Sequence, residues 1–179
     1  MLEAAGVEHD VVPARIDEDA VKARLSNGSE IAAELAKAKA LDVSTDRTKD
    51  WVIGSDSVVT VAGRLFDKPV DRAHAAEHLR FFSGRSIQLT SAVALARAGK
   101  IEWSCCDSAM LQVRELSEEF IGSYLDAEWP EVSYCVGVFR IEGRGVQLFE
   151  KIEGDHFAIL GMPLFPLLGA LRERGVIAR

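Results

Sequence analysis

The sequence predicts a mixed α/β fold of α+β character, with a sheet rich in antiparallel strands. Short apolar runs joined by tight turns, as on either side of residues 62–64, are typical of hairpins. Segments with helical spacing of apolar residues lie between them. In the clearest one, leucines fall at i, i+3, i+4 and i+7: Leu164, Leu167, Leu168 and Leu171. Because hairpins and helices alternate irregularly, a regular series of strand–helix–strand units is excluded.

Turn and cap residues divide the first half of the chain into elements. A Ser, Asp or Asn before an apolar-periodic run indicates a helix start, and a glycine after it indicates the end. In order, we expect a last helical turn at 1–5 ended by Gly6, a strand at 7–12, a helix from its N-cap Ser29 to Ala40, and a strand at 51–61 that breaks at Gly54–Ser57.

The second half follows the same signals. In order, we expect a hairpin turn at 62–64, a helix capped by Asp71 and ended by Ser83-Gly84, a strand at 87–97, strands near 101–103 and 109–113, a helix capped by Ser117, a hairpin at 132–152 turning at Gly143–Gly145, a short strand between Gly154 and Gly161, and a C-terminal helix ended by Gly175.

Composition limits the classes of function. A chain of 179 residues fits one domain, or one domain with two lobes. The net charge of -7 argues against a broad basic surface for nucleic acid. No apolar run approaches the roughly 20 residues of a membrane span, and the acidic start does not resemble a signal peptide. Three cysteines without metal-ligand spacing indicate reduced thiols in a cytoplasmic protein. From the charge and the apolar runs together, we expect neither nucleic-acid nor membrane partners.

The most suggestive stretch is Gly54-Ser55-Asp56-Ser57, within an otherwise apolar strand. A carboxylate at a break in a strand is exposed at the sheet end while its backbone is held rigidly. That placement suits a general base or a metal ligand. The alternative is a turn aspartate that bonds its own backbone.

Two lysines are candidates for binding an anion. Ile31, Leu35 and Lys39 follow at steps of four, so Lys39 extends the buried stripe of a helix and Lys37 points elsewhere. Such a cation either reaches into a cleft or extends to water. Lys68, just before the helix capped by Asp71, is a phosphate-steering candidate or an ordinary surface lysine.

Carboxylates and histidines complete the candidates. The cluster Asp17-Glu18-Asp19 reads either as a solvated loop entering a helix or as a cation site beside Asp56, since Mg²⁺ takes one or two carboxylates together with phosphates and water. His74 and His78 share a helix face at i, i+4, but the sequence indicates no third metal ligand.

Eight short runs, taken in chain order, resemble the Maf family of nucleoside triphosphate pyrophosphatases. They cover nearly the whole chain: Leu35–Ala40, Val52–Asp56, Lys68-Pro69, Leu79–Gly84, Leu116-Ser117, Ile141–Gly143, Ile152–Asp155 and Leu160–Leu164. The resemblance implies a single domain over residues 1–179, with two lobes on a long curved mixed sheet and a central cleft. It also implies hydrolysis of a nucleoside triphosphate to the monophosphate and diphosphate.

The resemblance assigns roles to charged residues. Asp56 stands at the family's proposed proton acceptor, and Glu18, Lys39 and Lys68 fall on other charged cleft positions. A divalent cation, Mg²⁺ or Mn²⁺, is then expected at Asp56 and Glu18, and a homodimer is the assembly that the family suggests. Two alternatives are a nucleotide-binding regulator of growth or division without turnover, and the related enzymes that remove inosine or xanthosine triphosphates.

Three features depart from the family pattern: the start of the chain, Glu142 and Ser57. The family opens with a strand reading Leu-Ala-Ser-x-Ser-x-x-Arg, whereas residues 1–6 align with the helix that follows, so the N-terminal strand is expected to be missing. Glu142 stands where many members carry a glutamine, and in this the chain resembles the branch associated with 7-methyl-GTP. The physical rationale is that a carboxylate can accept the paired N–H groups of a cationic guanine. Ser57 stands where that branch carries a glutamine and completes the predicted substrate-binding set.

Overall fold

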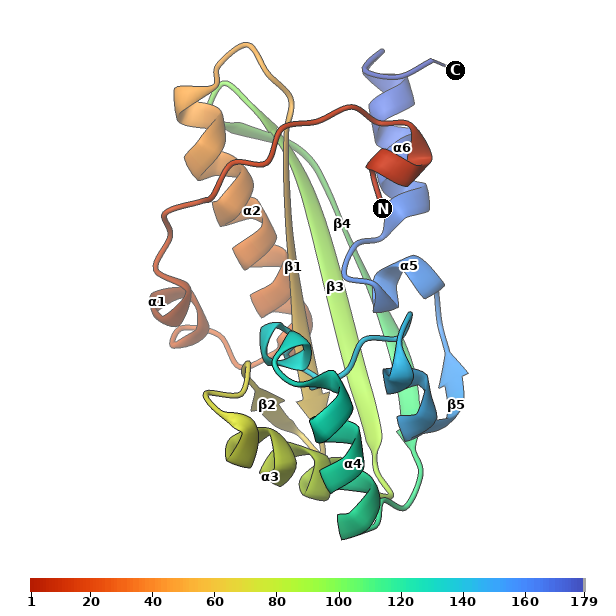
Figure 1. The fold of residues 1–179 in the computed structure, drawn as a ribbon. Coiled ribbons are helices and arrows are strands. Elements are labelled where there is room, and N and C mark those ends of the chain that lie inside the picture. The colour runs from red at the N-terminus through yellow and green to blue at the C-terminus, as the bar shows by residue number, and fades with distance from the viewer. Residues whose placement is uncertain (179) are drawn as a thin grey trace. The chain divides into compact units, whose positions relative to one another are not determined.

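The computed structural model describes residues 1–178, whose helices and strands are drawn in Figure 1. These residues form two compact units. Among the described residues, unit 1 comprises Met1–Ser57, Thr90–Asp107 and 155–178, and unit 2 comprises Val58–Leu89 and Ser108–Gly154. Within the described residues, no helix combines the length and the apolarity that crossing a bilayer requires.

Helices occur in both units. The α-helices are α1 (Glu18–Lys22), α2 (Gly28–Asp46), α3 (Arg72–Phe82), α4 (Glu118–Glu128), α5 (His156–Ile159) and α6 (Leu164–Glu173). Three short 3-10 helices accompany them: η1 (Glu3–Ala5), η2 (Glu131–Tyr134) and η3 (Arg144–Leu148).

Five strands form one sheet in the order β2-β1-β3-β4-β5. Their bounds are β1 (Val52–Val61), β2 (Arg64–Phe66), β3 (Ser86–Arg97), β4 (Lys100–Val113) and β5 (Phe149–Glu153). β1 pairs with β2 and β4 pairs with β5, both antiparallel. The turn between β1 and β2 is two residues long, and Ala62 and Gly63 both take the positive φ that such a hairpin favours. The expected mixed α/β fold is confirmed.

Unit 1 has a core built from helix α6 and strand β3. Its fully or nearly buried members include Leu2, Val93, Leu95, Leu167 and Leu171. Leu167 and Leu171 belong to the stripe predicted for the C-terminal helix. Gly175 follows that helix with φ +67, the left-handed conformation that a helix-ending glycine adopts.

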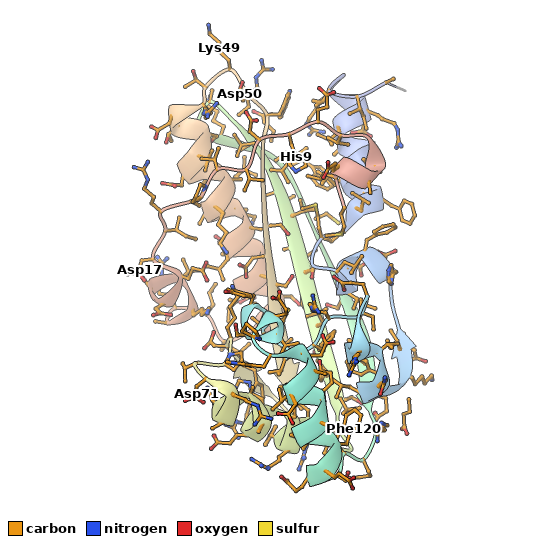
Figure 2. The ribbon with its side chains drawn as sticks, in the orientation of Figure 1. His9, Asp17, Lys49, Asp50, Asp71 and Phe120 are labelled. Carbon is orange, nitrogen blue, oxygen red and sulfur yellow. The ribbon has the colours of Figure 1, made fainter. Side chains whose placement is uncertain are left out.

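Unit 2 contains the contacting helices α3 and α4. The side chain of Asp71 accepts from the backbone N–H of His74 at the start of α3, and Ser117 does the same for Phe120 at the start of α4. Figure 2 shows Asp71 and Phe120 at these helix starts. Both predicted caps are therefore confirmed.

The predicted histidine pair lies on α3. The Nε2 atoms of His74 and His78 are 3.0 Å apart, and His78 packs edge-on against Phe66. Burial, followed by the charge of His74, lowers the pKa of His78, so this ring is held neutral among aromatic side chains.

Four boundaries differ from the prediction. β1 is continuous from Val52 to Val61, so the break expected at Gly54–Ser57 is wrong, and the strands expected near 101–103 and 109–113 are one strand, β4. Helix α2 is capped by Asn27, whose side chain accepts from the N–H groups of Ser29 and Glu30, and it extends beyond Ala40. A glycine inside a strand does not have to interrupt it, and Asn27 precedes Ser29 with equal capping ability.

Three expected strands do not form as predicted. Residues 7–12 have no regular structure: Val11 is 86% exposed, and no strand pairs with this segment. The hairpin expected at 132–152 is replaced by η2, η3 and the single strand β5, which pairs with β4. The segment between Gly154 and Gly161 contains helix α5, because the side chain of Asp155 caps it by accepting from two backbone N–H groups.

Candidate functional site

Strand β1 presents two chemically different faces. Successive side chains of a strand point to opposite sides, so Gly54 and Asp56 share one face, and Ser55 and Ser57 share the other. A Cβ atom on Gly54 would lie 2.6 Å from the backbone nitrogen of Ala40 in α2. The missing side chain therefore lets the α2 backbone pass unusually close to β1.

Helix α2 brings a cation to the Asp56 side of the strand. Ile31 and Leu35 are fully buried, and Lys39, next on the same stripe, places its Nζ 2.6 Å from Oδ1 of Asp56. Lys37 instead pairs with Glu34 on the exposed side, 2.8 Å away. The stripe predicted from the spacing is therefore present, and of the two lysines it directs only Lys39 toward Asp56.

A second carboxylate reaches the same ammonium group. Asp17 caps the one-turn helix α1, which begins at Glu18 (Figure 2 labels Asp17). Oε1 of Glu18 lies 2.8 Å from Nζ of Lys39. Asp17 is therefore the cap at a helix entry, as the first interpretation of the acidic cluster expected, and Glu18 pairs with Lys39. Cation binding by the cluster stays a prediction. The Asp56 side chain is only 11% exposed, whereas that of Glu18 is 44% exposed.

The electrostatics of this cluster leave Asp56 more basic than an ordinary aspartate. Burial raises the pKa of its carboxyl group, and the hydrogen bond and charge of Lys39 offset only part of that rise. Burial acts to lower the pKa of Lys39, but its two carboxylate partners outweigh burial and hold that pKa above the ordinary value. The cluster therefore combines Lys39, which stays protonated, with Asp56, which accepts a proton more readily than an ordinary aspartate does.

Oδ1 of Asp56 and Oε1 of Glu18 face the same ammonium group, Nζ of Lys39, at 2.6 and 2.8 Å. Within residues 1–178, no group of three or more His, Cys, Asp or Glu side chains is placed to hold a metal ion. Mg²⁺ takes one or two carboxylates and completes its shell with phosphate oxygens and water. A divalent cation at Asp56 and Glu18 would need phosphate oxygens and water to complete its shell, and it stays a prediction.

Ser57 lies on the opposite face of β1 from Asp56. Its Oγ is 2.7 Å from Oγ of Ser91, which donates to the carbonyl of Ala158 at 2.7 Å. Ser55 donates to the carbonyl of Gly161 at 2.8 Å. This serine network fastens β1 to the segment around α5, and the substrate-binding role of Ser57 stays a prediction. The sequence carried no signal for Ser91, a polar residue within an apolar strand.

The other two predicted residues, Lys68 and Glu142, lie in unit 2, and the charges of both act on the pKa of one thiol. The half-buried Cys135 has its pKa raised by burial first and then by the charge of Glu142, while Arg140 and Lys68 act to lower it. Lys68 and Glu142 are both exposed. They therefore lie within electrostatic reach of the same side chain, and their roles remain predictions.

Comparisons with known proteins cover almost the whole chain. A family model described as "Maf-like protein" matches residues 1–174. The 7-methyl-GTP pyrophosphatase of Rhizobium etli is 46% identical over 181 residues, which cover 99% of this chain and 91% of that protein. The nucleoside triphosphate pyrophosphatase of Nitrobacter hamburgensis is 45% identical over 180 residues, covering 99% and 89%. The 7-methyl-GTP pyrophosphatase of Rhizobium johnstonii is 44% identical, covering 99% and 91%.

Proposed function

Because this chain belongs to the Maf family, we propose that it is a nucleoside triphosphate pyrophosphatase, a hydrolase that acts on an acid anhydride. It cleaves a nucleoside triphosphate to the monophosphate and diphosphate. The mixed α/β fold with its five-stranded sheet agrees with the fold expected for that family. The observation that carries the proposal in the structure is the cluster of Asp56, Lys39 and Glu18.

Asp56 has the position and the basicity to prepare the attacking water. Its carboxylate is held by a rigid strand, is mostly buried, and has a pKa raised by burial. A general base is most effective when its pKa lies closer to the working pH. Asp56 would therefore orient a water molecule and accept its proton during attack between the α- and β-phosphates.

Lys39 supplies charge for the phosphates. Its ammonium group keeps its proton because two carboxylates face it, so a positive charge is available where negative charge gathers on the diphosphate leaving group. Asp56 and Glu18 would hold a divalent cation, Mg²⁺ or Mn²⁺, and that ion would neutralise phosphate oxygens. Lys68 is assigned a similar phosphate-binding role.

Organisation and location belong to the same proposal. Residues of β1, β3 and β4 are shared between the two units, which supports treating 1–179 as one domain. We place the enzyme in the cytoplasm, where its three free cysteines stay reduced. A homodimer follows only from the family resemblance, and size-exclusion chromatography with light scattering would test it.

Pyrophosphate release by the purified chain tests the function directly. The panel contains GTP, 7-methyl-GTP, dTTP, UTP and inosine triphosphate, each with Mg²⁺ or Mn²⁺. We expect metal-dependent release of diphosphate from at least one nucleotide, with 7-methyl-GTP preferred. Tight binding without release of diphosphate from any of them would instead identify a nucleotide-binding regulator. A preference for inosine triphosphate would assign the chain to the enzymes that remove inosine or xanthosine triphosphates.

The two lysines of α2 are expected to differ. Lys39→Ala should weaken binding of a non-hydrolysable triphosphate analogue by roughly 10- to 100-fold, the scale of one lost hydrogen bond to a charged group. It should also move the acid limb of the kcat/KM profile to higher pH. The reason is that the charge of Lys39 lowers the pKa of Asp56, and a base works only once it has lost its proton.

Lys37→Ala is the matched control, because Lys37 lies on the same helix and pairs only with the exposed Glu34. It should leave both the affinity and the acid limb unchanged. If the two lysine variants behave alike in titrations and pH profiles, Lys39 does not face the substrate.

Glu142 is proposed to select the base. Glu142→Gln should lower the preference for 7-methyl-GTP over dTTP by roughly 5- to 150-fold, the range for one lost pairing that the bound base would shield from water. An amide offers one acceptor where the carboxylate offers two, and it lacks the charge that attracts a cationic base. The kcat/KM ratios across GTP, 7-methyl-GTP, dTTP and UTP measure the effect. Constant ratios would make Glu142 an ordinary surface residue.

A further inference from the structure

Helix α4 fastens the segment that precedes Glu142 at two points. Tyr124 and Glu128 are four residues apart, so both side chains lie on one face of the helix. The Tyr124 hydroxyl donates to the carbonyl of Val138 at 2.9 Å in a buried position. Nη2 of Arg140 donates to Oε2 of Glu128 at 3.0 Å, and Nε reaches the same oxygen at 3.4 Å. One helix face thus holds residues 138 and 140.

The pair formed by Glu128 and Arg140 is unusual for its location. The Glu128 side chain is 7% exposed, and Glu128 is the last residue of α4. A helix end of this kind disfavours a carboxylate, and burial disfavours any charge. An ion pair retained under these conditions suits a role in fixing conformation better than a role in stability.

The held segment has a strained backbone. Val138 is fully buried and has φ +56, the left-handed region that a β-branched residue rarely adopts. Such strain persists only where the surroundings fix the conformation, and it is concentrated at functional sites. The carbonyl group bonded by Tyr124 belongs to this strained residue.

Arg140 is also the first residue of a tight turn that contains Glu142. The N–H of Gly143 donates to the carbonyl of Arg140 at 3.2 Å. A Cβ atom on Gly145 would lie 2.7 Å from the backbone nitrogen of Arg140, so this turn leaves no room for a side chain there. Glu142 is exposed within the turn, and its charge reaches Cys135 together with that of Lys68.

We infer that Tyr124 and Glu128 are positioning residues that set the place of Glu142 through Val138 and Arg140, and thereby the base preference. The inference rests on the proposed role of Glu142. Neither side chain needs to touch the nucleotide. Tyr124 acts on the turn through the carbonyl group of Val138 and Glu128 acts through the side chain of Arg140, so they govern which nucleotide binds and leave the chemistry at Asp56 unchanged.

The test measures binding preference, so it does not depend on turnover. The affinities of non-hydrolysable analogues of 7-methyl-GTP and dTTP are compared for Tyr124→Phe and Glu128→Gln, each alone and combined with Glu142→Gln. Each single change should lower the preference by roughly 2- to 10-fold, the scale of coupling between neighbouring residues. In the Glu142→Gln background, neither change should lower the preference further.

Glu118→Gln is the matched control on the same helix. It breaks an exposed pair with Arg80, whose Nε and Nη2 lie 2.7 and 2.8 Å from its carboxylate, and it should leave the preference unchanged. Arg140→Lys keeps the charge but loses the paired N–H donors of the guanidinium group, and it should lower the preference as Glu128→Gln does. If Glu128→Gln does not fold, Tyr124→Phe and Arg140→Lys still give the answer.

Three results would overturn the inference: an unchanged preference in the single variants, an equal loss in both backgrounds, or a native chain without any preference. Pyrophosphate release by the native chain is measured alongside. A chain that binds with the expected coupling but releases no pyrophosphate would contradict the proposed function and leave this inference standing.

Discussion

Asp56→Asn is expected to lose activity by roughly 100-fold or more while it folds as the native chain does, since a positioned base contributes on that scale. An amide has the shape of the carboxylate but cannot accept the proton of the attacking water. Burial raises the pKa of Asp56 in the folded chain. At pH values above the ordinary pKa of aspartate, the ionised carboxylate therefore lowers the stability of the folded chain. The neutral amide removes that destabilisation, and Lys39 keeps Glu18 as a partner.

Pyrophosphate release and thermal melting, measured on the same preparation, check this result. Asp46→Asn is the matched control, because Asp46 is an exposed aspartate at the C-terminal end of α2, away from Asp56 in β1. It should keep both the activity and the melting temperature. Near-normal turnover by Asp56→Asn would remove Asp56 from the catalytic role.

Gly54→Ala is expected to destabilise the chain by about 1–3 kcal/mol, the usual cost of overpacking. The added Cβ would meet the backbone of α2, 2.6 Å from the Ala40 nitrogen and 2.9 Å from its Cβ. Backbone cannot rotate away, so α2 must move off β1. Lys39 is the neighbour of Ala40 and moves with it, so its ion pair with Asp56 should lengthen and activity should fall as well.

Gly169→Ala is the control within the same unit. Gly169 lies inside α6, and nothing would stand within 4 Å of a Cβ there. Alanine in a helix interior is more favourable than glycine by roughly 0.5–1 kcal/mol, so this variant should melt slightly higher. If the two variants melt at the same temperature and retain equal activity, close approach at Gly54 does not position Lys39.

Local signals in the sequence were sufficient where a residue acts on its own neighbours. Asp71 and Ser117 cap helices because their side chains accept from N–H groups three residues ahead, and any chain context leaves that bond available. The leucine stripe of α6 and the stripe that ends at Lys39 were predictable in the same way, because helical spacing alone fixes the buried face.

Long-range partners decided the remainder. Gly54 was expected to break a strand, but the strand continues and the glycine makes room for α2, a neighbour that local sequence does not reveal. Residues 7–12 have strand-like composition but no strand partner. Between 132 and 152, contacts with α4 and the tight turn at Arg140 hold a compact conformation where a hairpin was expected.

The candidate site divides along the same line. Spacing predicted that Lys39 faces away from Lys37, and the pattern around Gly54 singled out Asp56, whereas the convergence of Glu18 on Lys39 depends on where α1 lies beside α2. Tyr124 and Glu128 carried no signal at all, because a buried Tyr–carbonyl bond and a buried ion pair exist only between segments that fold together.

Product analysis with the native chain and 7-methyl-GTP in the presence of Mg²⁺ tests the central claim most directly. Chromatography of the nucleotides and a separate assay of phosphate and diphosphate give the stoichiometry. One monophosphate and one diphosphate are predicted for each triphosphate consumed, with no nucleoside diphosphate at any time. Formation of nucleoside diphosphate and orthophosphate, or no consumption of any nucleotide in the panel, would contradict the account.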